Sequence, residues 1–239
     1  MTLIRKHNEV YFKKVCFMSF SRRDFLGTSA AAASAIGFTS FSSSTQASYM
    51  PEARRMAFKV SANGKNIGEH LIKFEMQNTK LHVKSSVDVA VKLAGFTAFY
   101  YRLLAHEVWK DGKLVQLKSK SDMNGKENKL VALAKPDGLL IQSNNKRFTA
   151  SSDTLPTSYW NPSVLQKSRL LNMQTGKLTA VRSAKVGSDK VTTAGIPTPA
   201  DRYRVTGDVS MVLWYSQNGE WSAGSFQMQG HRVTFMRDV

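Results

Sequence analysis

The chain has 239 residues, and its 34 Lys and Arg side chains outnumber its 17 Asp and Glu side chains, for a formal net charge of +17. Its one cysteine, Cys16, lies near the N-terminus, so the rest of the chain excludes disulfides, cysteine-ligated zinc, iron–sulfur clusters and covalently attached haem. The positive charge favours polyanionic partners such as anionic lipid head groups or acidic polysaccharides. The charges are dispersed, however, and no block of five like charges marks a binding tail, so a merely solvated basic surface is the alternative.

The N-terminal segment has the order of parts that is typical of a twin-arginine export signal. Arg22 and Arg23 supply the charged region, and residues 25–41 form a weakly apolar run, too short and too polar for a membrane-spanning helix of about 20 apolar residues. The small residues at positions 45 and 47 place signal-peptidase cleavage after Ala47. The alternative is an ordinary Ala-rich helix after a chance Arg-Arg pair.

The sequence therefore predicts a signal peptide over residues 1–47. Translation could instead begin at Met18, in which case the start codon has been assigned too early and residues 1–17 are not translated. The sequence also predicts the twin-arginine translocase and a signal peptidase as partners, a periplasmic location, and no transmembrane helix in the mature chain.

From residue 52 onward, apolar and polar residues alternate as in half-buried β-strands. The clearest case is residues 81–93, where every odd-numbered position is apolar except Ser85. Residues 96–109 are apolar on both faces, which predicts a strand covered on both sides or a β-bulge. Strong hairpin turns occur at Asn63-Gly64, Asp111-Gly112, Asn124-Gly125 and Asn218-Gly219. The predicted strands are residues 55–61, 67–76, 81–93, 96–109, 114–123, 129–134, 139–143, 177–186, 202–206, 209–215, 221–229 and 231–236.

One helix is predicted between these strands. It begins at Pro162 after the capping residue Asn161 and ends before Gly176, with a modest inward stripe that includes Val164 and Leu171. The predicted fold class is thus mainly β: a single curved antiparallel sheet of about ten strands, a half-barrel or open barrel, with one short helix. Residues 48–239 form this one domain.

Three short motifs carry a resemblance to a known family. They are Gly64-Lys65-Asn66-Ile67-Gly68-Glu69-His70 before an apolar strand, Tyr159-Trp160-Asn161, and Leu213-Trp214-Tyr215 together with Trp221. Over most of residues 52–239 the chain resembles a family of twin-arginine-exported bacterial proteins of unknown function, similar to the curved half-barrels of the LolA lipoprotein-carrier type. The resemblance implies a sheet of roughly ten strands curled around a helix and, by analogy of fold alone, lipid binding. It brings no catalytic residues.

Catalytic motifs are missing from the sequence: there is no H-E-x-x-H, G-x-S-x-G, P-loop or G-x-G-x-x-G pattern. We therefore predict no catalytic residue, no metal site and no cofactor. His70 is the best single candidate for chemistry, because it shares one strand face with Ile72 and Phe74 and should point inward. Burial would lower the pKa of His70 and leave a neutral imidazole suited to ligand contact or proton transfer. The alternative is a hydrogen-bonded core histidine.

Aromatic residues supply the rest of the predicted site. With His70, the predicted ligand-binding set is Tyr159, Trp160, Trp214, Tyr215 and Trp221. Such side chains on a concave surface could hold acyl chains, although large aromatic residues also build ordinary cores. We predict a periplasmic, non-catalytic protein that binds an apolar or amphipathic ligand (a lipid or acyl chain), with basic residues at the rim meeting an anionic head group or another anionic envelope component. There are two alternatives: a small enzyme that uses a buried His70, and a module that binds envelope polysaccharide or protein. Nucleic acid is excluded as a partner by the export signal and the lack of a basic helix.

Overall fold

The computed structural model describes residues 51–93, 96–144, 146–228 and 230–238. Cys16 and the predicted signal peptide, with Arg22, Arg23 and Ala47, lie outside these ranges, so the division at residue 47 stays a prediction. All of the ranges fall within one compact unit of the chain, Tyr49–Val239.

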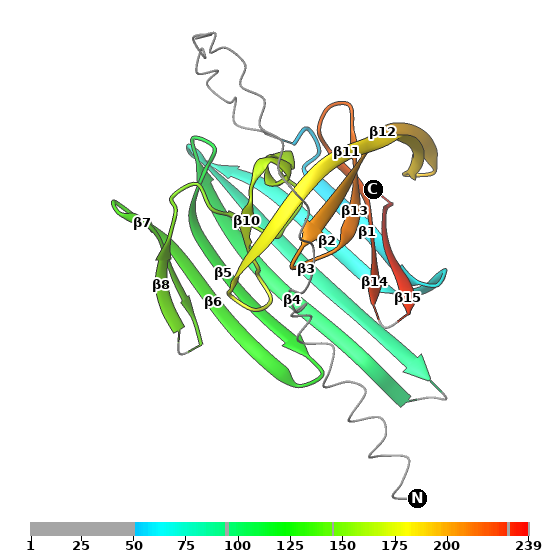
Figure 1. The fold of residues 1–239 in the computed structure, drawn as a ribbon, viewed down its shortest axis with the longest axis horizontal. Coiled ribbons are helices and arrows are strands. Elements are labelled where there is room, and N and C mark those ends of the chain that lie inside the picture. Colours follow the sequence, from blue (N-terminus) through cyan, green and yellow to red (C-terminus); the bar gives the residue numbers. More distant parts are fainter. Residues whose placement is uncertain (1–50, 94–95, 145, 229, 239) are drawn as a thin grey trace, which may run out of the picture. The chain divides into compact units, whose positions relative to one another are not determined.

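One sheet of 15 strands makes up most of this unit (Figure 1). The strands are β1 (Arg55–Ala62), β2 (Lys65–Gln77), β3 (Lys80–Leu93), β4 (Phe96–Lys110), β5 (Lys113–Met123), β6 (Lys126–Lys135), β7 (Gly138–Ser143), β8 (Lys146–Ala150), β9 (Leu155–Pro156), β10 (Arg169–Leu171), β11 (Leu178–Thr193), β12 (Ile196–Gly207), β13 (Met211–Ser216), β14 (Trp221–Met228) and β15 (His231–Arg237). The predicted mainly β class is confirmed, but the predicted number of about ten strands is wrong. The sequence patterns missed β8, β9 and β10, because strands of two to five residues are too short to show a period of two.

The path of the chain explains how the sheet curls. β1 pairs with both β2 and β15, and the strands follow one another outward on each side, to β8 at one edge and β9 at the other. Residues 151–154 alone join these two edges. Five Cα–Cα steps of about 3.8 Å can span at most about 19 Å, so the edges come close together where the connection joins them. A sheet of 15 strands can do this only if it is strongly curved.

Tight turns set the register of the hairpins. Asn63-Gly64 and Asn124-Gly125 have positive φ at both residues, as the predicted two-residue turns require. Ala194-Gly195 makes the same kind of turn between β11 and β12, with φ of 51° and 80°. The sequence analysis did not predict this hairpin, because alanine is not a typical turn residue. As a result β11 and β12 run much longer than predicted.

The predicted helix from Pro162 to Gly176 is wrong in kind and in length. Asn161 does cap a helical turn, but the turn is a five-residue 3-10 helix, η2 (Pro162–Gln166), and strand β10 begins three residues later. Gly176 serves another purpose: its φ is +66°, and a Cβ atom there would lie 2.1 Å from Oγ of Ser143. Within the described ranges, no helix has the length and apolar character needed to cross a membrane.

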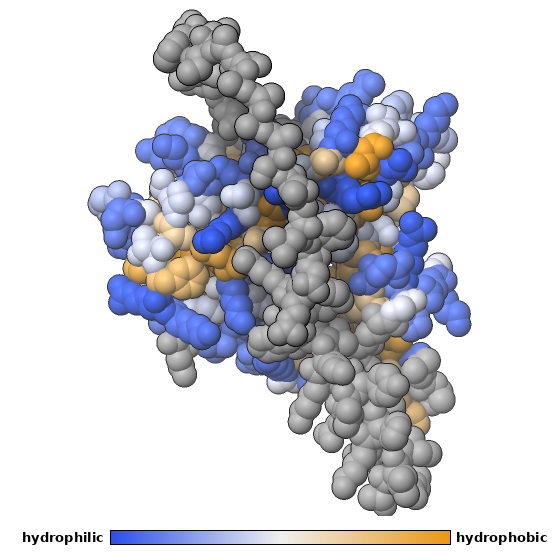
Figure 2. Space-filling view, viewed as in Figure 1, coloured by the Kyte–Doolittle hydropathy of each residue, from blue (hydrophilic) through white to orange (hydrophobic). Residues whose placement is uncertain are grey.

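The core lies on one face of the sheet, where residues 151–177 cover it. We call this stretch the inner segment; it contains β9, η2 and β10 and appears in front of β4 and β5 in Figure 1. Ser119 of β5 donates a hydrogen bond from Oγ to the carbonyl oxygen of Met173 at 2.8 Å, and Ser121 donates to that of Gln174 at 3.0 Å. The concave side of the sheet is therefore filled by the chain itself. In Figure 2, many of the described residues on the visible face are hydrophilic, with hydrophobic patches between them.

Candidate functional site

The structure brings five of the six predicted site residues to the core side of the sheet. These five are His70, Tyr159, Trp160, Tyr215 and Trp221. Trp214 lies apart from them, because adjacent residues on a strand point to opposite faces and Tyr215 points inward. Its indole nitrogen donates to Oδ2 of Asp189 at 2.8 Å, and it packs beside a small separate cluster that includes Val191 and Ala223.

Aromatic rings surround His70. The ring centroids of Phe58, Trp221 and Phe235 lie 5.7, 5.6 and 6.1 Å from the His70 centroid. His70 is only 6% exposed, and its Nδ1 atom has no hydrogen-bond partner. Burial lowers the pKa of His70 from 6.5 to about 4, so the ring is neutral at physiological pH. The side chain points inward as predicted, but no acid or nucleophile contacts it among the described residues.

Trp160 belongs to a buried group around Glu107 of β4, a residue that the sequence analysis did not single out. The indole nitrogens of Trp109 and Trp160 donate to Oε2 of Glu107 at 2.9 and 3.1 Å. Burial raises the pKa of Glu107 to about 7, against the effect of these hydrogen bonds, and the side chain is fully enclosed. The carboxyl group thus ties the inner segment to β4.

Tyr159, Tyr215 and Trp221 form the remaining contacts of the interior. The Tyr215 hydroxyl donates to the carbonyl oxygen of Tyr159 at 2.7 Å, and the Tyr159 and Trp221 rings lie 5.8 Å apart. Trp221 and Trp160 are 2% and 1% exposed. These side chains are packed against one another, as in a core, and they line neither of the two pockets described below.

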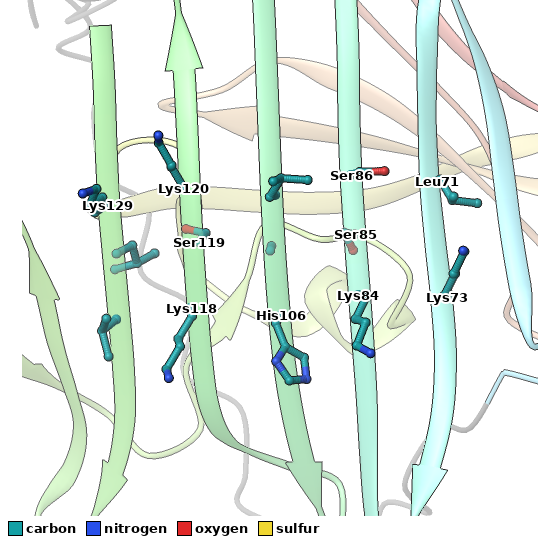
Figure 3. Close-up of a pocket in the computed structure, with 14 residues that line it drawn as sticks. Leu71, Lys73, Lys84, Ser85, Ser86, His106, Lys118, Ser119, Lys120 and Lys129 are labelled. Carbon is teal, nitrogen blue, oxygen red and sulfur yellow. The ribbon is translucent and has the colours of Figure 1, made fainter.

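The larger pocket lies on the opposite face of β2 to β6, and its volume is about 620 Å³. We call it the outer groove. Its lining residues are Leu71, Lys73, Lys84, Ser85, Ser86, Leu104, Ala105, His106, Lys118, Ser119, Lys120, Lys129, Leu130 and Val131. Figure 3 shows Lys73, Lys84, His106 and Lys118 in a row across four strands. The lining contains five lysines and no acidic residue.

The floor of the outer groove is apolar where β4 crosses it. Leu104 is 64% exposed, which is unusual for a leucine in the middle of a long strand, and Leu71 and Val131 line the groove from β2 and β6. Residues 96–109 are therefore apolar on both faces without being covered on both sides. A β-bulge is present as well, between Val108 and Trp109.

A histidine pair joins this row to the next outward-facing position of β3, because His106 belongs to the row and His82 lies two residues from Lys84. Nδ1 of His82 and Nε2 of His106 are 3.0 Å apart, so one ring donates a hydrogen bond to the other. Partial burial lowers the pKa of His106, and the neighbouring His82, Lys84 and Lys118 lower it further. His82 lies on the outward face of β3 with Lys84, and it contacts a ring on the next strand.

A smaller, more polar pocket of about 390 Å³ lies near the end of β15. A mostly buried ion pair between Glu220 and Arg237 borders it, and Oε1 of Glu220 also accepts from the backbone nitrogen of Ala53. These contacts hold the start of β1 against β14 and β15. Across the described ranges, no three His, Cys, Asp or Glu side chains gather in a way that would hold a metal ion.

Sequence reasoning missed the lysines of the outer groove as a group. Lys118 and Lys120 alternate with core residues on one strand, and this spacing is visible in the sequence. Their alignment with Lys73 and Lys84 depends on the register of three successive hairpins, which no single strand pattern reveals.

Comparison with known proteins agrees with this fold. The chain is similar in structure to a β-barrel-like protein of domain of unknown function DUF1849 from Brucella abortus, with a TM-score of 0.55 and 10% identity, over 77% of this chain and 94% of that one. At this identity the likeness concerns the fold alone. No functionally curated protein matches the chain. The family model described as "Domain of unknown function (DUF6134)" matches residues 58–238, so the chain belongs to that family.

Proposed function

We propose that this chain is an exported binding protein that works in the periplasm and holds an amphipathic anion in the outer groove. Export is supported by the twin-arginine pattern at Arg22 and Arg23 and by the cleavage signal at Ala47. The twin-arginine translocase and a signal peptidase are then its partners during export.

The observation that carries the binding role is the combination of charge and apolar floor in the outer groove. Five lysines surround it without an acidic residue in the lining, so a negatively charged group is attracted there. Leu104, 64% exposed between these lysines, offers apolar surface that an alkyl chain would remove from water. A ligand with both an anionic group and an alkyl chain satisfies both features.

The interior is a poorer place for the ligand than the sequence suggested. A guest among His70, Trp160 and Trp221 would have to displace the inner segment and break its hydrogen bonds to β4 and β5. The enzyme alternative also loses support, because the neighbours of His70 are aromatic rings rather than an acid or a nucleophile.

Calorimetric titration of the purified protein with three probes tests the proposal. The probes are decyl phosphate below its micelle concentration, inorganic phosphate, and a decyl maltoside with a neutral head group. We expect decyl phosphate to bind most tightly, since only it uses both the lysines and the apolar floor. Replacing Leu104 by Ser should weaken decyl phosphate binding about tenfold, from loss of about 1.4 kcal/mol of apolar burial.

Phe96→Ser provides the matched control. Phe96 lies on the same strand and is 79% exposed, but it does not line the outer groove. Its loss should leave binding unchanged. Equal affinity for decyl phosphate and inorganic phosphate would refute a role for the apolar floor, and no binding of either would end the proposal.

A further inference from the structure

The lysines of the outer groove form two clusters, one on each side of β4. Lys73 and Lys84 stand directly opposite each other on β2 and β3. Lys120 and Lys129 stand opposite each other on β5 and β6, with Lys118 two residues along β5 from Lys120. We call these the β2–β3 cluster and the β5–β6 cluster. Figure 3 shows the two groups of side chains on either side of the strand that carries His106.

Each cluster contains a like-charge pair in which one of the two lysines has no ion-pair partner among the described residues. Like charges directly opposite on neighbouring strands are destabilising. Among the described residues, Lys73, Lys118 and Lys129 form no ion pair. Lys84 has only a 3.8 Å contact with exposed Glu75, while Lys120 pairs with exposed Glu127 at 2.8 Å. Two sets of lysines kept together at this cost are consistent with two anionic groups supplied from outside.

Acidic residues mark the limit of the basic region on one side. The next outward-facing row across the same strands contains Glu69, Asp88, Asp122 and Glu127, with one arginine among them. An anion is repelled by this acidic row and is therefore confined to the outer groove. The pattern therefore favours a ligand of defined length over a long polyanion that continues across the sheet.

The spacing of the clusters sets that length. Neighbouring strands are about 4.8 Å apart, and three such steps separate the middle of the β2–β3 cluster from the middle of the β5–β6 cluster, about 14 Å. One phosphate or carboxylate group is only a few ångströms wide, so it cannot occupy the middle of both clusters at once. Leu104 lies on β4 between the clusters, so the ligand's linking part crosses apolar surface.

We propose that the ligand of the outer groove is an amphiphile with two anionic groups, one bound by Lys73 and Lys84 and the other by the β5–β6 cluster, with its apolar part over Leu104. This inference rests on the proposed function and adds to it the number and separation of the charges.

The test compares three synthetic probes at matched ionic strength: decyl phosphate, a ten-carbon diol with a phosphate at each end, and a three-carbon diol with a phosphate at each end. Joining two binding groups raises affinity when the linker matches the span of the two sites. We expect the ten-carbon bisphosphate to bind at least tenfold more tightly than either of the other probes.

Paired substitutions show whether the two clusters act together. K73Q/K84Q and K120Q/K129Q should each reduce the affinity for the ten-carbon bisphosphate to about that for decyl phosphate. Each should change decyl phosphate binding by no more than about twofold, because the other cluster remains. The control is K110Q/K113Q, which removes another cross-strand lysine pair, at the β4–β5 turn outside the groove, and should change nothing.

The outcomes separate the inference from the proposed function. If decyl phosphate and the ten-carbon bisphosphate bind equally, the two-anion ligand is wrong while the binding role stands. If both bisphosphates bind equally, charge alone matters and the inferred spacing is wrong. If a sulfated polysaccharide displaces the bisphosphate, and if Leu104→Ser leaves the affinity for that polysaccharide unchanged, the ligand of the groove is a glycan and the inference is overturned. If no probe binds, the proposed function falls as well.

Discussion

Replacing Glu107 by Gln should change how the stability of the protein depends on pH. Glutamine has the shape of the protonated acid, and its amide oxygen can keep the hydrogen bonds from Trp109 and Trp160. The substitution therefore removes the ionisation of a fully buried carboxyl group while preserving its main contacts.

The sign and size of the effect follow from the pKa of Glu107 in the two states. Burial raises this pKa from 4.5 in the unfolded chain to about 7 in the folded protein. Between these values the folded state holds a proton that the unfolded state has lost, so wild-type stability falls as pH rises. The difference corresponds to about 3 kcal/mol, at about 1.4 kcal/mol per pKa unit. This loss of wild-type stability is complete above about pH 7, and E107Q does not show it.

Denaturant unfolding followed by tryptophan fluorescence measures the effect. We expect the free energy of unfolding of E107Q, relative to wild type, to increase by about 3 kcal/mol from about pH 4.5 to pH 8. Glu127→Gln is the control: Glu127 is exposed, and its hydrogen bond to Lys120 lowers its pKa, so this variant should show a small change of opposite sign. A flat difference between E107Q and wild type across this range would refute the reasoning.

His70 should hide part of this dependence in the wild-type protein. Its pKa is lowered from 6.5 to about 4, so the unfolded chain takes up the proton first and stability falls as pH drops through this window. Between about pH 4.5 and 6.5 the contributions of His70 and Glu107 therefore oppose each other. E107Q should reveal the His70 contribution as stability that increases with pH.

Three further predictions concern the inner segment, the outer groove and export. Gly176→Ala should destabilise the protein by more than Gly195→Ala in thermal unfolding, because both glycines have positive φ but only at Gly176 would the added Cβ meet another side chain; equal effects would contradict the close approach. Decyl sulfate, which stays singly charged over this range, should bind more tightly as pH falls, since protonated His106 adds a positive charge to the groove, and His106→Gln should reduce this dependence; calorimetry at several pH values checks both. Replacing Arg22 and Arg23 by Lys should leave the protein in the cytoplasm, which cell fractionation and immunoblotting would detect; unchanged periplasmic yield would contradict the twin-arginine route.

The fold was largely predictable where strands are long and half buried. β3 alternates apolar and polar residues over its length, and the turn at Asn63-Gly64 requires positive φ at two positions, so both were visible in the sequence. The inner segment was not predictable in the same way. Asn161 and Pro162 do start a helical turn, but contacts with β4 and β5 decide where the segment goes next, and those contacts join residues far apart in the chain.

The candidate site was harder to predict than the fold. The burial of His70 follows from its position on one strand, so local pattern was sufficient. The pairing of Lys73 with Lys84, and the alignment of both with Lys118, depend on register carried across several hairpins. Charged residues on an exposed strand face also have no strong pattern of their own. The lysines were therefore seen as dispersed charge until the strands were placed side by side.

The pairing of β1 with β15 has a consequence for the order of events in the cell. Lys59 and Asp238 bond across 179 residues of sequence, and the last strand is the neighbour of both the first strand and β14. The sheet cannot close until β15 has left the ribosome, and contacts so distant in sequence form slowly. On the proposed twin-arginine route, this closure must then be completed before translocation. Removing β15 would take away the strand that joins the two halves of the sheet.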